Sequence, residues 1–344
     1  MTVLVKTTRG KFDDTEHHGI VTVCDVDGNV LYAVGDHNRL VFSRSSAKPF
    51  QAISVVESGA LEEYGISEKE LAVMCSSHNA ESFHVDAIRS ILKKADLDES
   101  YLKCGSHMPI AQYVANEFIK NDIKPTEVHS NCSGKHSGML ITAKKLGYSM
   151  DDYYDLEHPI QQIILDNLAF CCVADKDDIE IGIDGCGVPV HALPMHKWAR
   201  GFARLSKPKV MGEDRAKTVR RITTAMTNHP EMIAGDKRIC TALNDVFGDR
   251  LFAKSGALAF YGIGIKDRGI GISIKLLDAK SEMLPFVIFE VLIELGVITR
   301  DELSKLDEFF TDINMYNFRH EVVGEKFVAF DMKDYKYYGG DNVR

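Results

Sequence analysis

The chain has 344 residues, enough for one large domain or for a domain with a sizeable insertion. Its net charge is −9 with histidine neutral, and it has no long basic run, which argues against nucleic acid or an anionic membrane as partner. No apolar run approaches the length of a membrane span.

Two features of the sequence indicate the same cellular location. Residues 1–6 lack the basic region and the long apolar core of a secretory signal. The chain also has eight cysteines, which without an export signal are expected to be reduced thiols or metal ligands rather than disulfides. We therefore expect a cytoplasmic protein.

The first part of the chain, residues 2–42, is typical of β-structure. Residues 20–26 and 30–34 flank Asp27-Gly28, a pair that tolerates the positive φ angles of a tight turn. This pattern predicts a hairpin.

From residue 45 to about residue 250 the pattern is mostly helical. Ser67 and Glu70 have the spacing of a capping box, and His158-Pro159 is typical of a helix start. Asn79 is expected to cap the helix that follows it.

The tail returns to strands and closing helices. Residues 257–265 and 269–276 predict a hairpin of central strands, residues 284–296 and 300–310 predict helices, and residues 326–332 predict a last strand. Strands at both ends with helices between them indicate a single α/β domain of the α+β type, with one antiparallel sheet built from both termini. The sheet subdomain is expected at about 1–60 and 250–344, and the helical subdomain at about 61–249.

Three short motifs carry candidate chemistry. Ser45 and Lys48 form Ser-x-x-Lys, and on a helix residues i and i+3 share a face, so that the amine could take the proton of the hydroxyl. Ser77-His78-Asn79 and Lys254-Ser255-Gly256 follow in that order. The three motifs in this order are the signatures of penicillin-recognising serine hydrolases.

Two glycine-rich turns each contain a thiol. Cys132 lies in residues 131–138 and Cys186 in residues 183–189, and neither has the Cys-x-x-Cys spacing of a zinc finger. Each could be only a tight turn with a buried cysteine. Both are nevertheless places where the backbone can approach a ligand, beside Lys135, His136 and Asp184.

Several motifs in order resemble a known family. Residues 44–52, 75–78, 131–136, 184–189 and 234–235 resemble the asparaginase II family, the Rhizobium-type class 3 L-asparaginases, over nearly the whole chain. The resemblance implies a fold similar to that of serine β-lactamases and glutaminases. It also implies two Ser-Lys pairs as catalytic residues, Ser45 with Lys48 and Ser77 with Lys254.

The same resemblance implies a Zn²⁺ ion near the site. Its ligands would be Cys132, Lys135 and Cys186, with water in the fourth position. Thiolates are good zinc ligands, and a lysine can join them only when it is deprotonated. The candidates for substrate binding are Arg44, His78 and Asp184, of which Asp184 would link the metal and substrate sites.

We therefore expect an L-asparagine amidohydrolase that forms L-aspartate and ammonia through an acyl-serine intermediate. The family usually continues its third motif with Glu-Gly, where this chain has Leu258-Ala259. The alternatives are another amide or lactam hydrolase of this fold, for example a glutaminase-like enzyme, and a catalytically idle zinc-binding homologue. A homodimer is expected by analogy alone.

Overall fold

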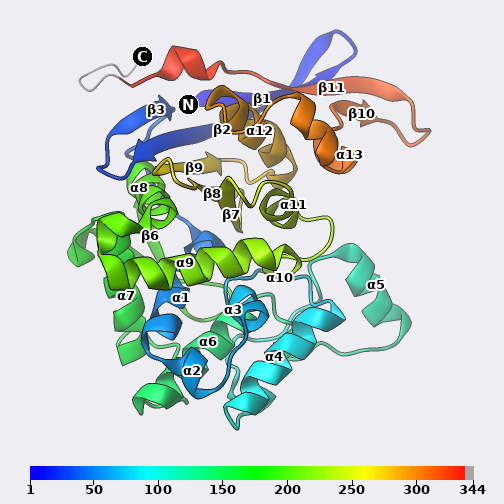
Figure 1. Ribbon diagram of the computed structural model, residues 1–344. Coiled ribbons are helices and arrows are strands. Elements are labelled where there is room, and N and C mark those ends of the chain that lie inside the picture. The colour runs from blue at the N-terminus through cyan, green and yellow to red at the C-terminus, as the bar shows by residue number, and fades with distance from the viewer. Residues whose placement is uncertain (338–344) are drawn as a thin grey trace.

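The large sheet of the protein is antiparallel and is built from both ends of the chain (Figure 1). The computed structural model describes residues 1–337. The strand order is β10-β11-β1-β2-β9-β8-β7, and β3 pairs with β2 outside this path. A small second sheet has the order β4-β6-β5.

The strands have the following bounds: β1 Thr2–Arg9, β2 Phe12–Asp25, β3 Val30–Val34, β4 Leu40–Phe42, β5 Glu180–Ile183, β6 Pro189–Pro194, β7 Leu251–Gly256, β8 Phe260–Ile265, β9 Ile270–Leu276, β10 Asn314–Tyr316 and β11 Val322–Val328. The central pairings β2–β9, β9–β8 and β8–β7 are all antiparallel. The predicted fold class, an antiparallel sheet from both chain ends with a helical region inserted, is confirmed.

The helices have the following bounds: α1 Lys48–Glu57, α2 Ala60–Glu63, α3 Glu68–Met74, α4 Ser82–Lys94, α5 Gln112–Lys120, α6 Ser133–Leu146, α7 Pro159–Cys172, α8 Met195–Ser206, α9 Glu213–Asn228, α10 Pro230–Ile233, α11 Ile239–Val246, α12 Leu284–Glu294 and α13 Glu308–Thr311. A 3₁₀ turn, η1, covers Arg44–Ala47 directly before α1. No helix within residues 1–337 is both long and apolar enough to cross a membrane.

Local sequence signals explain several of these boundaries. β2 and β3 form the expected hairpin around Asp27-Gly28. Ser67 accepts a hydrogen bond from the backbone of Glu70, whose side chain accepts from the backbone of Ser67, and this capping box starts α3. α7 begins at Pro159 behind its N-cap His158.

Two local predictions were wrong. Asn79 caps no helix, because α4 begins three residues later at Ser82 with Glu81 as its N-cap. Lys254 does not precede a strand but lies inside β7, and residues 257–259 form the turn to β8. An apolar run therefore contained the turn and one strand of the hairpin.

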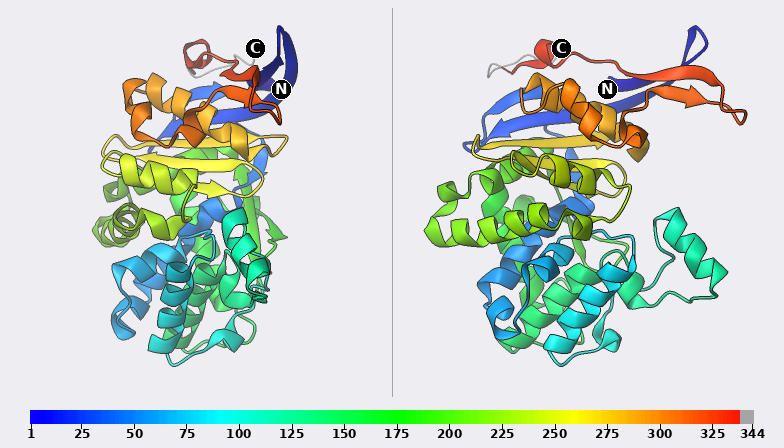
Figure 2. Two further views of the ribbon diagram at one scale, coloured as in Figure 1. Left: turned by 90° about the vertical axis from the view of Figure 1, so that its right-hand side faces the viewer. Right: turned by 45° about the vertical axis from the view of Figure 1, so that its right-hand side comes forward.

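The helices α1 to α7 lie mainly on one side of the sheet, below it in Figure 1, and the views of Figure 2 agree. α8 packs on β9, β2 and β8 and so joins this helical region to the sheet. α12 packs near the other end of the sheet, on β11 and β1. The C-terminal part of the chain, from β7 onward, therefore packs against the N-terminal strands.

The proposed subdomain boundaries stay a prediction. All strands of the large sheet lie within residues 2–34 and 251–328. However, α8 belongs to the predicted helical part and packs on the sheet, while α1 belongs to the predicted sheet part and packs on α6, α7 and α9. Residues 338–344 of the predicted sheet subdomain lie outside the described residues.

The core contains two charged side chains where apolar ones are expected. Lys48 and Lys254 are among the largest fully buried side chains, with 1% and 0% of their surface exposed. Burying a lysine without a partner costs several kcal/mol, so these two residues lead directly to the candidate site.

Candidate active site

One serine hydroxyl lies between the two buried lysines. The Nζ atoms of Lys48 and Lys254 each lie 3.1 Å from Ser77 Oγ. Ser77 is held in the loop between α3 and α4, where its backbone N–H donates to the carbonyl of Ile233 at 2.9 Å. Three residues from distant parts of the chain therefore share one contact point.

Each lysine is presented by a rigid element. Lys48 is the first residue of α1, and Pro49 follows it. Proline costs the helix no hydrogen bond at this position, because the N–H groups of the first turn have no partner within the helix. Lys254 lies in the middle of β7 and pairs with Gly262 of β8. The hydroxyl of Ser46 donates to the carbonyl of Lys254 at 2.6 Å, which ties the start of α1 to β7.

The electrostatics of Lys254 suit a base. Burial lowers the pKa of Lys254 to about 7, and the nearby positive charges of Lys48 and Arg238 act in the same direction. At neutral pH a substantial fraction of this amine is therefore neutral and can accept a proton.

Lys48 makes contacts that the motif spacing did not predict. Besides Ser77, its amine donates to the backbone carbonyls of Ser76 and Asn131 and lies 3.3 Å from Cys132 Sγ. No hydrogen bond joins Lys48 Nζ to the Ser45 hydroxyl within residues 1–337. Ser45 lies in η1 and lines a small cavity together with Lys48.

The two predicted thiol turns meet beside this lysine. Cys132 is the N-cap residue of α6, Lys135 lies in its first turn, and Cys186 lies in the turn between β5 and β6. Lys135 Nζ is 3.0 Å from Cys186 Sγ, and the thiol of Cys132 is hydrogen-bonded to Cys186. Gly134, in the same first turn, lets α6 pack closely on α3, because a Cβ there would overlap the carbonyl of Val73.

The thiols and the amine polarise one another. The hydrogen bond from Cys132 lowers the pKa of Cys186 to about 4 against the effect of burial, and the Lys135 ammonium adds to this lowering. The same hydrogen bond raises the pKa of Cys132 to about 12, with burial adding to it. Burial would lower the pKa of Lys135, but the interactions with the two thiols and with Asp184 together outweigh burial and raise this pKa. The cluster therefore holds a buried thiolate beside an ammonium.

Asp184 connects the thiol turn to the Ser-x-x-Lys segment. Its carboxylate accepts hydrogen bonds from Arg44 Nε at 2.9 Å, from Arg44 Nη2 and from the backbone of Gly185. Burial would raise the pKa of Asp184, but the hydrogen bond from Arg44, the charge of Lys135 and the hydrogen bond from Gly185 together outweigh burial and lower this pKa. Arg44 has a φ of 53°, a conformation that costs about 1–2 kcal/mol outside glycine, and the ion pair offsets this strain.

A comparison with protein families assigns the chain to a family. The family model described as L-asparaginase II matches residues 5–328 of the chain. The chain belongs to the L-asparaginase II family. The resemblance seen in the sequence is therefore confirmed.

The solved structures that resemble the fold of this chain have low sequence identity to it. Mglu in its glutamate form is 11% identical with a TM-score of 0.45, and the match covers 82% of this chain and 62% of that one. A β-lactamase from Mycobacterium bovis is 12% identical with a TM-score of 0.42 and coverages of 80% and 94%. The chain thus spans less than two thirds of the matched Mglu chain, and likenesses of this size carry no argument about activity. No curated protein matches the sequence.

Two residues of the Ser77-His78-Asn79 motif make contacts within the protein around the candidate site. The backbone N–H of Ala80 donates to His78 Nδ1, and His78 Nε2 lies 2.9 Å from Ser133 Oγ at the start of α6. Both ring nitrogens of His78, which was proposed to bind substrate, are therefore engaged within the protein. Asn79 accepts from Arg238 Nη1 at 2.8 Å.

Arg238 and the cavity residues Gln51 and His191 were missed from the sequence. Arg238 precedes α11 and adds a positive charge near Lys254. Gln51 and His191 line the cavity that contains Ser45. Gln51 lies within the motif of residues 44–52 but was given no role there, and no motif marks Arg238 or His191, because their roles arise from strand and helix packing.

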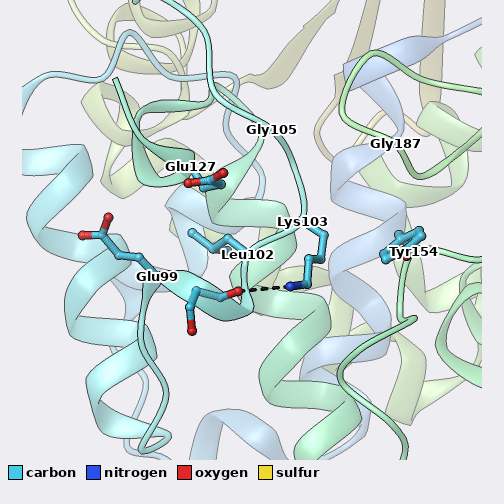
Figure 3. Close-up of a pocket in the computed structure, with 8 residues that line it drawn as sticks. Glu99, Leu102, Lys103, Gly105, Glu127, Tyr154 and Gly187 are labelled. Carbon is cyan, nitrogen blue, oxygen red and sulfur yellow. Dashed lines mark hydrogen bonds between the residues drawn. The ribbon is translucent and has the colours of Figure 1, made fainter. Parts of the chain in front are cut away.

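A larger hollow of this L-asparaginase II chain, about 490 Å³, lies away from the predicted catalytic residues. Figure 3 shows its lining, which includes Glu99, Lys103, Glu127 and Tyr154. It reaches the thiol turn only at Gly187, and none of the four predicted catalytic side chains lines it. We therefore place the candidate site at Ser45, Ser77 and the two lysines rather than in this larger hollow.

Proposed function

We propose that the protein hydrolyses L-asparagine to L-aspartate and ammonia through an acyl-serine intermediate. The observation that carries the proposal is the contact of two buried lysine amines with one serine hydroxyl. Amide hydrolysis needs a nucleophile, a base for its proton and an acid for the leaving ammonia. Two amines, of which one has a pKa of about 7, can supply both the base and the acid.

Ser45 is the proposed nucleophile. Its side chain is partly exposed and lines the cavity, whereas Ser77 is only 5% exposed and is held by both amines. In the acylation step Ser45 Oγ bonds to the amide carbon, the C–N bond breaks, and the hydroxyl proton leaves with ammonia. The motif order supports this role, because Ser-x-x-Lys contains the nucleophile in the penicillin-recognising hydrolases.

Ser77 is the proposed proton carrier between the lysines. Lys48 Nζ and Lys254 Nζ each lie 3.1 Å from Ser77 Oγ. Lys48 can therefore donate a proton to Ser77 while Ser77 donates its hydroxyl proton to Lys254. Lys48 lines the same cavity as Ser45 and so connects this relay to the nucleophile. The relay lets the charge rest on Lys254 while ammonia is being formed.

The residues of the thiol cluster fit a zinc ion. Within residues 1–337 no group of three or more His, Cys, Asp and Glu side chains could hold a metal ion, so a site here requires the lysine. Lys135 and Cys132 each contact Cys186, all three residues are buried, and two soft sulfur ligands with a nitrogen ligand suit zinc. When bound, the ion would keep these three groups deprotonated and would supply a Lewis acid. Lys48 Nζ, at 3.3 Å from Cys132 Sγ, would link this group to the relay.

Replacement of each serine tests the mechanism. Ser45→Ala is expected to abolish ammonia release and the covalent adduct, and Ser77→Ala to slow ammonia release by about 10²–10⁴-fold, the range for loss of general acid–base catalysis. Ser206→Ala is the control, because Ser206 is also buried but donates to a carbonyl in α8. Full turnover in both site variants would exclude the serine mechanism.

The same assay decides the substrate. Ammonia release is compared for L-asparagine, L-glutamine, simple primary amides and a chromogenic lactam, with the metal content of the sample measured alongside. Preference for L-glutamine or the lactam would replace asparagine in the proposal. Bound zinc without hydrolysis of any substrate would favour the idle homologue.

Two further proposals concern the state of the protein in the cell. The eight cysteines are all unpaired thiols, which suits a reducing cytoplasm. A homodimer is proposed from the family resemblance, and sedimentation at several protein concentrations measures it.

A further inference from the structure

The cavity that contains Ser45 is small and polar. Its volume is about 10 Å³, which is room for about one water molecule and not for an amino acid side chain. It is lined by Arg44, Ser45, Ala47, Lys48, Gln51, Lys135, Asp184, Pro189, Val190 and His191. Its lining therefore brings the proposed nucleophile together with several hydrogen-bonding groups.

Two of the lining side chains have a buried polar atom without a partner. Gln51 Oε1 and His191 Nε2 make no hydrogen bond within the described chain, although the residues are only 8% and 2% exposed. Leaving such an atom unsatisfied costs about 1–3 kcal/mol. A polar molecule in the cavity that forms hydrogen bonds with both atoms would remove both costs.

The two residues reach this cavity from different elements of the fold. Gln51 lies on α1 one turn after Lys48, so it faces the same side of the helix. His191 lies on β6, next to the turn that contains Cys186. Within the described residues, the imidazole of His191 and the thiols of Cys132 and Cys186 do not form a group that could hold a metal ion. Metal binding beside the two thiols therefore does not explain why His191 Nε2 has no partner.

We propose that Gln51 and His191 hold the water molecule that releases the product from Ser45. The inference rests on the proposed function, because it supplies the second half of the reaction. Gln51 Oε1 accepts a hydrogen bond from the water, and His191 Nε2 fixes its orientation. The two residues are positioning residues, since they act on the water and form no bond to the acyl group.

The step is balanced without any further reactant. The water oxygen bonds to the carbonyl carbon of the acyl group, and the bond from that carbon to Ser45 Oγ breaks. One proton of the water passes through Lys48 to Ser45 Oγ, which restores the hydroxyl. The product leaves as the carboxylic acid and then loses its proton to solvent.

The test separates release of the product from formation of the acyl-enzyme. The full-length enzyme with its native metal content is mixed with L-asparagine, and ammonia and the protein mass are followed over the first turnovers. In Gln51→Leu and His191→Leu we expect a rapid release of one ammonia per site, accumulation of acyl-Ser45, and at least 10-fold slower steady turnover. Hydroxylamine, a small nucleophile that needs less positioning, is expected to restore turnover in the variants more than in the parent enzyme.

Three comparisons make the result specific. His191→Gln keeps a polar group and should recover turnover to within about 5-fold of the parent, because hydrogen bonding is retained. Gln161→Leu is the matched control, since Gln161 also has a buried unpartnered Oε1 but lies outside this cavity, and its product release should not change. If one leucine variant fails to fold, the other and the His191→Gln variant still decide the outcome.

The possible failures are distinguishable. If the parent enzyme hydrolyses asparagine without an acyl group on Ser45, the proposed function is wrong and the water site falls with it. If acyl-Ser45 forms but the variants lose ammonia release and product release equally, or lose neither, the water site alone is refuted.

Discussion

Replacing Lys254 by methionine is expected to make the protein more stable and inactive. Burial lowers the pKa of this amine from 10.5 to about 7, a shift of about 3.5. At 1.36 kcal/mol for each pKa unit, holding the charged form in the fold costs about 5 kcal/mol. The variant loses the hydrogen bonds to Ser77 and to the carbonyl of Ser255, and each loss lowers its stability by about 1 kcal/mol. We therefore expect a net gain in the free energy of unfolding of about 1–3 kcal/mol.

The gain should depend on pH in a defined direction. The pKa of Lys254 is lower in the folded protein than in the unfolded chain, so the unfolded chain binds the extra proton between pH 7 and pH 10.5. The free energy of unfolding of the parent protein therefore rises with pH across that window. The cost is fully present below pH 7 and disappears above pH 10.5. The advantage of Lys254→Met should accordingly be largest near pH 6 and should shrink towards pH 9.5.

Thermal or urea unfolding of both proteins between pH 6 and pH 9.5 measures this difference. The activity assay accompanies it, since kcat/KM of the parent enzyme should rise with a midpoint near pH 7 and be lost in the variant. Lys217→Met, at a side chain that is 71% exposed, is the control and should change neither quantity. The reasoning is refuted if Lys254→Met is less stable than the parent at every pH, or if its advantage does not vary with pH.

Three further changes test other parts of the structure. Cys186→Ser should lower the zinc content measured by metal analysis at least 10-fold, whereas Cys24→Ser, at a buried thiol outside the cluster, should leave it unchanged. Ala259→Gly should raise the free energy of unfolding by up to about 1 kcal/mol, because Ala259 has a φ of 57°, while Ala257→Gly, without a positive φ, should lower it. Tyr153→Phe should lower stability by about 1–3 kcal/mol in urea unfolding, because its buried hydroxyl bonds both a histidine ring and a backbone N–H, and an unchanged midpoint would contradict this.

The turn that departs from the family pattern has a plain structural consequence. Leu258 and Ala259 stand where the family usually has Glu-Gly, and both have positive φ angles, of 58° and 57°. Glycine adopts this conformation without strain, whereas alanine and leucine do not. Because glycine is replaced only at Ala259, the departure adds a local cost at this residue of the β7–β8 turn, and Leu258 is 57% exposed.

Strand and helix signals that depend on neighbouring residues could be interpreted from the sequence. The hairpin around Asp27-Gly28, the capping box at Ser67 and the start of α7 all follow from contacts within a few residues. The prediction failed at Asn79, because its side chain is taken by Arg238, which is 159 residues away in the sequence. It failed again in residues 257–259, where an apolar run does not reveal a turn.

The sequence by itself determined the residue types, the order of the three motifs and the sheet made from both chain ends. It could not determine that Lys48 contacts Ser77 rather than Ser45, since spacing says only what can meet on one helix face. The tertiary structure decided this contact by burying both lysines against one loop. It also decided the low pKa of Lys254 and the partnerless atoms of Gln51 and His191, because burial depends on everything packed around a group and not on its neighbours in the chain.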